Sequence, residues 1–255
     1  VRSMARLNNK VVLITGGASG LGRSGATLMH AQGAKVIITD INEDLGKATA
    51  AEIGDNALFV QHDVSKLVEW DQVIDLIIER YGRLDVLVNN AGIVVVADVE
   101  KTQFEDWRAV HAVGTDGTFF GIQKGIGAMR ETGGGSIINM SSVAGIIGYP
   151  LVFAYSASKG AIRSMTKSAA VYCAQNSLGI RVNSIHPGTI ATPMVAGFEA
   201  VVEEQGEERV KLLLGEPDDV GHMMVYLASD ESKFVSGSEF VIDSTASITE
   251  GLVPG

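Results

Sequence analysis

Three side chains have the types and spacing needed for proton-transfer chemistry. Tyr155 and Lys159 stand four positions apart, so on a helix their side chains share one face. Ser142 precedes Tyr155 and follows an apolar run. A free phenol has a pKa of about 10, and a neighbouring ammonium group stabilises the phenolate. We therefore expect Tyr155 to transfer a hydroxyl proton, Lys159 to lower the pKa of Tyr155, and Ser142 to hold a substrate oxygen.

A glycine-rich segment, TGGASGLG at positions 15–22, directly follows the first apolar run. Glycine permits a tight turn and close approach of the backbone to a pyrophosphate, and the next helix offers free N–H groups. Asp40 lies where a carboxylate can bind both ribose hydroxyls of an adenosine and repel a 2′-phosphate. No Lys or Arg occupies positions 18, 19, 41 or 42, so we expect NAD rather than NADP as the cofactor.

These residues must be positioned by short apolar runs that alternate with amphipathic stretches. The runs are continuous rather than alternating, which is typical of strands covered on both faces. The pattern therefore predicts a doubly wound α/β fold with a parallel sheet, and it places Ser142 at the carboxyl end of a strand, where ligands bind. The expected strands are Lys10–Thr15, Lys35–Thr39, Ala57–Val60, Leu84–Asn89, Ser136–Met140, Ile180–Ile185 and Glu239–Ile242.

The composition bounds the class of protein. With 255 residues, we expect a single domain over positions 1–255. A net charge of −10 argues against binding to nucleic acid or an anionic membrane, and one cysteine excludes an intramolecular disulfide. There is neither an apolar stretch of membrane-spanning length nor an apolar signal core, so we expect a cytoplasmic protein. The five histidines have no metal-ligand spacing, and no metal site is expected.

The ordered set of motifs resembles the classical short-chain dehydrogenase/reductase family from Lys10 to Asp243. It comprises the 15–22 turn, NNAG at 89–92, Ser142, the pair Tyr155 and Lys159, and PGTIAT at 187–192. The resemblance implies a Rossmann-type domain of about seven strands in the order 3-2-1-4-5-6-7, assembled as a homotetramer. It also implies hydride transfer between a nicotinamide cofactor and an alcohol or ketone.

The resemblance assigns roles to further residues. Asn90 would support the cofactor pocket, Lys159 would also bind the nicotinamide ribose, and Ile190 with Thr192 would contact the carboxamide. Asp63 and Val64, after the third strand, could bind the adenine. The expected cofactor residues are Gly16, Ser19, Gly20, Leu21, Gly22, Asp40, Ile41, Asp63, Val64, Asn90, Ala91, Gly92, Tyr155, Lys159, Pro187, Gly188, Ile190 and Thr192.

Segments 125–142, 181–194 and 229–240 look like those of bacterial 3β/17β-hydroxysteroid and cyclic-alcohol dehydrogenases. This likeness implies a hydrophobic secondary alcohol as substrate, with cyclic and steroid-like alcohols among the candidates. Residues 192–216 could form a lid over it, or their acidic cluster could be a solvated helix face. The expected substrate pocket consists of Val94, Val96, Tyr149, Met194 and Phe198.

The chain departs from the family pattern at two places. Gly114 stands where the family usually has an asparagine that helps to hold a relay water; a water or a neighbour such as His111 would have to replace it. Asp243-Ser244-Thr245 replaces the usual Asp-Gly-Gly, so the tail could pack differently. Two alternative functions stay open. One is a reductase of 3-oxoacyl thioesters, which Asp40 disfavours in its usual NADPH form. The other is a dinucleotide-binding sensor with little turnover.

Overall fold

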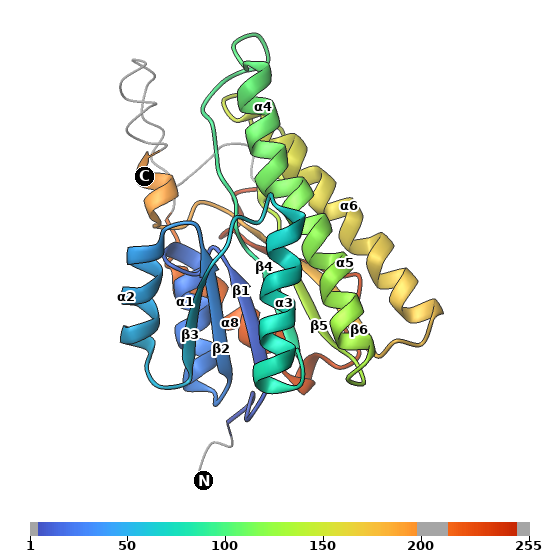
Figure 1. Ribbon diagram of the computed structural model, residues 1–255. Helices are drawn as coiled ribbons and strands as arrows, with labels where there is room; N and C mark the ends of the chain where they lie inside the picture. Colours follow the sequence, from blue (N-terminus) through green and yellow to red (C-terminus); the bar gives the residue numbers. More distant parts are fainter. Residues whose placement is uncertain (1–4, 198–213, 249–255) are drawn as a thin grey trace.

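A computed structural model describes residues 5–197 and 214–248 (Figure 1). Its seven strands form one parallel sheet in the order β3-β2-β1-β4-β5-β6-β7, which confirms the predicted fold. The sequence placed every strand within two residues of its observed end, because the apolar runs are the buried strands themselves. The strands are β1 Val11–Thr15, β2 Lys35–Asp40, β3 Ala57–Gln61, β4 Val86–Asn89, β5 Gly135–Met140, β6 Ile180–Pro187 and β7 Glu239–Ile242.

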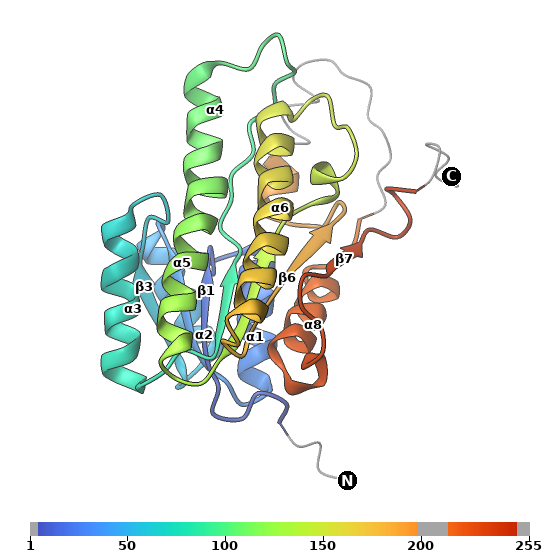
Figure 2. The same ribbon diagram turned by 90° about the vertical axis from the view of Figure 1, so that its right-hand side faces the viewer.

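Helices cover both faces of the sheet (Figures 1 and 2). One face carries α1 (Gly20–Ala31), α2 (Glu43–Ile53) and α8 (Pro217–Ala228). The other carries α3 (Leu67–Tyr81), α5 (Gly117–Arg130) and α6 (Phe153–Gln175). The short helix α4 (Phe104–His111) runs into α5 through a π-helical turn at Ala112–Asp116. Short 3-10 turns lie at Val143–Gly145 and Asp230–Ser232.

Successive residues of each central strand point into opposite cores. In β1, Val12 and Ile14 pack with α1 and α8, whereas Val11 and Leu13 pack with α3 and α5. Each of these side chains is at most 1% exposed. Burial of one such side chain contributes roughly 1.5–3 kcal/mol, so both faces of the strand stabilise the sheet. The sheet is therefore a fixed platform for the residues that follow its carboxyl ends.

Among the residues that the structure describes, no helix is both long and apolar enough to span a membrane. The same residues contain no group of three or more His, Cys, Asp or Glu side chains that could hold a metal ion.

Candidate active site

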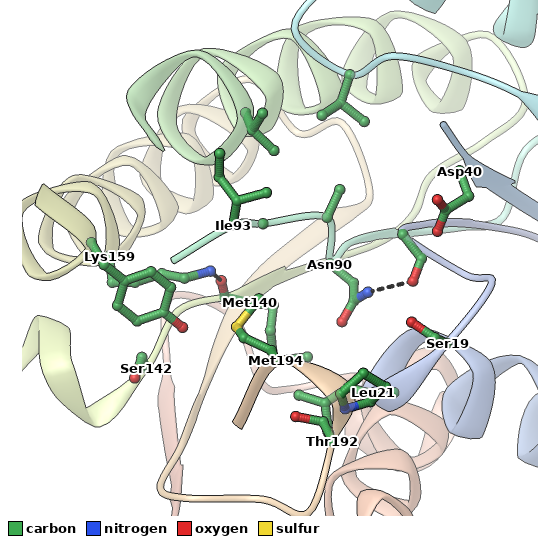
Figure 3. A pocket seen from close by; sticks show the side chains of 18 of the residues that line it. Ser19, Leu21, Asp40, Asn90, Ile93, Met140, Ser142, Lys159, Thr192 and Met194 are labelled. Atoms are coloured by element: carbon green, nitrogen blue, oxygen red, sulfur yellow. Dashed lines mark hydrogen bonds between the residues drawn. The ribbon is translucent and has the colours of Figure 1, made fainter. Parts of the chain in front are cut away.

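A cavity of about 640 Å³ opens at the carboxyl ends of the strands (Figure 3). It brings together the expected cofactor residues other than Gly22, with Ser142 and Met194 from the expected catalytic and substrate residues. Its lining comes from the loops after β1, β2, β3, β4, β5 and β6 and from α4, its π turn and α6. The lining residues that the sequence did not single out are His62, Ser65, Ile93, Ala109, Ala112, Val113, Met140, Ser141, Pro193 and Val195.

The glycine-rich turn presents the N-terminus of α1 to this cavity. Ser19 is the N-cap of α1, but its side chain makes no capping hydrogen bond. The first N–H groups of α1 therefore lack the usual side-chain acceptor, and Ser19, Gly20 and Leu21 line the cavity. Free N–H groups at the positive end of the helix dipole fit a pyrophosphate.

Gly22 supports this turn rather than lining the cavity. A Cβ atom at Gly22 would overlap the carbonyl oxygen of Gly16, so only glycine allows α1 to pack there. Asn90 holds the same turn from the other side, because its Nδ2 donates to the carbonyl oxygens of Thr15 at 2.9 Å and Gly16 at 3.0 Å. The turn is thus fixed before any ligand binds.

Asp40 ends β2 at the edge of the cavity, beside the glycine-rich turn. Its carboxylate accepts hydrogen bonds from the backbone N–H groups of Ala18 at 3.2 Å and Asn42 at 3.0 Å. These bonds fix the carboxylate at the cavity edge and leave further lone pairs for ribose hydroxyls. Within the part of the chain that the structure covers, Lys159 is the only Lys or Arg lining the cavity.

The part of the cavity that follows β3 contains a histidine that the sequence motifs did not single out. His62 is 1% exposed, its Nδ1 lies 3.2 Å from Thr39 Oγ1, and its ring meets Trp70 edge-on. Burial lowers the pKa of His62 to about 4. The position directly before Asp63 and Val64, at the end of a strand, was the available signal.

The Ser142, Tyr155 and Lys159 side chains line the other end of the cavity, where Figure 3 labels Ser142 and Lys159. The Nζ of Lys159 donates to the carbonyl oxygen of Met140 at 2.7 Å and lies 5.3 Å from the centre of the Tyr155 ring. Ser142 Oγ accepts the N–H of Ala144 at 3.1 Å, so its own hydrogen is free to donate.

Burial controls the protonation of these groups. It raises the pKa of Tyr155 to about 12, although a hydrogen bond with Ser142 opposes the rise. Burial also lowers the pKa of Lys159 to about 8. Desolvation of the phenolate is thus the largest influence on the pKa of Tyr155 in the protein without a bound cofactor, and the effect of Lys159 on this pKa stays a prediction. At neutral pH the tyrosine is therefore a phenol and the lysine is mostly an ammonium ion.

Gly114 lies at the centre of the π turn, against α6. A Cβ atom there would overlap Ser158 Oγ, so the serine already occupies the space that a larger residue needs. Thr115 Oγ1 donates to Ser158 Oγ at 3.0 Å and also lies 3.0 Å from His111 Nδ1. A polar chain of His111, Thr115 and Ser158 therefore fills this region in place of an asparagine amide.

The expected substrate residues are only partly brought together. Met194 lines the cavity, but Val94, Val96 and Tyr149 do not. The reason is that the segment leaving Ile93 turns along residues 151–153, where Ala97 N–H donates to the Leu151 carbonyl at 2.9 Å. Ile93, Met140 and Val195 provide apolar lining instead. Phe198 and most of the expected lid, residues 198–213, lie outside the described residues.

Comparison with known proteins agrees with this geometry. A family model described as "Enoyl-(Acyl carrier protein) reductase" matches residues 16–245. The NADP-dependent (R)-specific alcohol dehydrogenase of Lentilactobacillus kefiri is 47% identical over 93% of this chain and 96% of its own. The 3-beta-hydroxysteroid dehydrogenase of Comamonas testosteroni is 43% identical over 94% and 96%. A short-chain type dehydrogenase/reductase from Mycobacterium marinum superposes with a TM-score of 0.87 at 31% identity, covering 96% of this chain and 98% of its own.

A doubly wound parallel sheet with a glycine-rich turn and a Ser–Tyr–Lys site defines a dinucleotide-dependent oxidoreductase. More particularly, the chain belongs to the classical short-chain dehydrogenase/reductase family.

Proposed function

We propose that the protein interconverts a hydrophobic secondary alcohol and its ketone, with NAD as the cofactor. The observation that carries the proposal is the convergence of Ser142, Tyr155 and Lys159 in the cavity that also contains the uncapped N-terminus of α1. One end of that cavity suits a pyrophosphate and the other suits an alcohol oxygen.

Each part of the site would have a separate role. The N–H groups of α1 would bind the pyrophosphate, Asp40 the adenosine ribose, and Lys159 the nicotinamide ribose. When bound, the nicotinamide ring accepts or supplies the hydride. Tyr155 takes the hydroxyl proton during oxidation and returns it to the carbonyl oxygen during reduction. Ser142 donates a hydrogen bond to the same oxygen, and the Lys159 ammonium stabilises the phenolate.

Two features support NAD over NADP, although the Lentilactobacillus kefiri relative is NADP-dependent. The Asp40 carboxylate would repel a 2′-phosphate, and Lys159, at the opposite end of the described cavity lining, is its only Lys or Arg. The preference for hydrophobic substrates is supported by Ile93, Met140, Met194 and Val195 in the lining.

The test measures formation of reduced cofactor with secondary alcohols, including cyclohexanol and 3β- and 17β-hydroxysteroids, using NAD and NADP in parallel. In the reverse direction, a 3-oxoacyl thioester is supplied together with NADH or NADPH, and oxidation of the cofactor is measured. We expect turnover with NAD that falls by about 100-fold or more in Tyr155→Phe. Turnover of the thioester alone would favour the 3-oxoacyl reductase. Binding of NADH without turnover on any substrate would favour the sensor.

We also propose that the protein self-associates as a homotetramer. Several large apolar side chains on the outer surfaces of α5 and α6 are substantially exposed, namely Phe119, Phe153, Val171 and Tyr172. Exposed large apolar side chains on two helices that contact each other are candidates for a protein–protein contact. Because every copy of the chain presents the same surface, two copies could pair through it in a symmetric interface.

A further inference from the structure

His186 is a buried titratable residue that the proposed reaction does not use. It lies near the carboxyl end of β6 and is 0% exposed. Its Nδ1 is 3.3 Å from the carbonyl oxygen of Ser142, and its Nε2 is 2.8 Å from Ser184 Oγ. The ring thus connects the end of β6 to the backbone of the residue that would hold the substrate oxygen.

These two contacts define the tautomer of the His186 ring, that is, which of its nitrogens carries the hydrogen. A carbonyl oxygen can only accept a hydrogen bond, so Nδ1 carries the hydrogen and donates to Ser142. Burial lowers the pKa of His186; the bond to Ser142 and the charge of Glu239 on β7 oppose this, while Arg163 and Lys167 on α6 reinforce it. The ring is therefore neutral at pH 7, and its bare Nε2 accepts the hydroxyl hydrogen of Ser184.

Ser142 is the N-cap of the 3-10 turn at Val143–Gly145, so the position of its backbone carbonyl also fixes the position of its hydroxyl. The carbonyl oxygen accepts the N–H of Gly145 at 3.0 Å, so its two lone pairs serve the turn and His186. On the other side, Gly145 packs so closely on α6 that a Cβ atom would lie 2.8 Å from the carbonyl of Lys159. Ser141 Oγ also donates to that carbonyl at 2.9 Å.

The turn is therefore clamped between α6 and β6, and His186 is the side-chain contact on the β6 side. Ser142 and Tyr155 must present their hydroxyls to one oxygen atom, and small displacements of such groups are costly for the rate. We propose that neutral His186, through its Nδ1–H bond to the Ser142 carbonyl, is a positioning residue that sets the Ser142 hydroxyl beside Tyr155. This inference rests on the proposed function.

Two amide substitutions separate the two contacts of the ring. In His186→Asn the side-chain amide can occupy the place of Nδ1 and still donate to Ser142, but it does not reach Ser184. In His186→Gln the amide reaches the place of Nε2 and the Ser184 contact, but it leaves the Ser142 carbonyl without its donor. Both variants put a neutral amide in the same buried site, so each controls for the packing change in the other.

We expect His186→Gln to lower kcat by about 10-fold or more and His186→Asn to keep kcat within about 3-fold of the native enzyme. The Kd for NADH should stay unchanged in both, because His186 does not line the cavity. The melting temperature is measured alongside. Equal losses of kcat that follow the melting temperature, or an unaffected His186→Gln, would overturn the proposal.

A second measurement tests the proposal on the native protein, so it still applies if the variants do not fold or if the enzyme shows no turnover. The nitrogen-15 shifts of the imidazoles in native protein labelled at histidine report the tautomer of each ring. We expect a neutral His186 with hydrogen on Nδ1 between pH 7 and pH 9, and an Nε2–H tautomer would overturn the proposal. Absence of turnover in the native enzyme on every substrate would instead count against the proposed function, whatever the tautomer.

Discussion

Asp40 places a fixed negative charge at the edge of the cavity, beside the glycine-rich turn. Two backbone N–H groups hold it there, so its position does not depend on a bound ligand. A carboxylate that accepts ribose hydroxyls stabilises bound NAD, and the same charge opposes a 2′-phosphate. We therefore predict that this one side chain controls the preference between NAD and NADP.

Replacing this side chain tests the preference directly. We expect Asp40→Ala to lower kcat/KM with NAD by about 10-fold and to raise kcat/KM with NADP, since a charged hydrogen bond contributes roughly 1.5–3 kcal/mol. Steady-state kinetics with both cofactors measure the change. Asp44→Ala, which removes an exposed acid from the first turn of α2, is the matched control and should alter neither value. An unchanged NAD-to-NADP ratio in Asp40→Ala would contradict the assignment.

His62 makes stability depend on pH. Its pKa is lowered to about 4 by burial, whereas a histidine in an unfolded chain titrates at about 6.5. As the pH falls below 6.5, the unfolded chain gains a proton that the folded protein does not accept until near pH 4. Folding stability is therefore lost as the pH falls through this window.

The expected loss from His62 between pH 7 and pH 5 is about 2 kcal/mol of the free energy of unfolding. Urea denaturation at the two pH values measures it. In His62→Gln the decrease should be smaller by that amount, because glutamine does not titrate. If the native protein and the variant lose stability in parallel, His62 is not the responsible group.

At the scale of elements, the π turn and α6 meet without room for a side chain at position 114. Gly114→Ala would force its Cβ against Ser158 Oγ, which already fills the place of that atom. We expect Gly114→Ala to destabilise the protein by about 1–3 kcal/mol and to lower kcat, because Ser158 precedes Lys159 on α6.

A double-mutant cycle identifies the cause. Ser158→Ala removes the hydroxyl that would clash, so Gly114→Ala should cost much less in that background. Urea denaturation and kcat of the two single variants and the double variant give the coupling. Additive effects would show that the contact between these two residues is not what excludes a side chain at position 114.

The turn after β7 stores backbone strain. Ser244 and Thr245 have φ angles of 48° and 74°, in the left-handed region, and Asp243 accepts the N–H groups of Thr245 at 3.0 Å and Ser247 at 2.8 Å. A β-branched residue is especially unfavourable in this region. As far as residue 248, the chain after β7 thus forms a turn of the kind that glycine favours, and the expectation that the tail packs differently stays a prediction.

We expect Thr245→Gly to raise the free energy of unfolding by about 1 kcal/mol through relief of this strain. Ala246→Gly is the control; Ala246 has no positive φ, so it should lose stability through the added freedom of the unfolded chain. Urea denaturation compares the two variants. A loss of stability in Thr245→Gly would mean that the turn is not strained.

At the scale of the whole molecule, the exposed apolar side chains of α5 and α6 are the surface on which the proposed self-association depends. We expect light scattering to give four times the mass of one chain, and Phe119→Glu or Val171→Glu to reduce it, because a buried unpaired charge is costly. Leu45→Glu alters an exposed apolar residue on α2 and should leave the mass unchanged. A native protein that runs as a single chain would contradict the proposal.

The sequence by itself determined the strands, the layered fold and the identity of most of the residues that meet in the cavity. Continuous apolar runs such as residues 11–15 can satisfy their burial only as covered strands, and the ends of parallel strands then gather at one edge. Ser142, Tyr155 and Lys159 could be identified because their spacing maps onto those ends and onto one helix face.

Only the tertiary structure decided the environment of these residues. The pKa of Tyr155 depends on how far packing removes water from its hydroxyl, and the bond from His186 to Ser142 joins positions 44 residues apart. Val94 and Val96 are outside the cavity lining in a segment that pairs with a distant part of the chain, through the bridge between Ala97 and Val152. Desolvation and long-range contacts arise from segments that are distant in the chain, so local sequence patterns do not contain them.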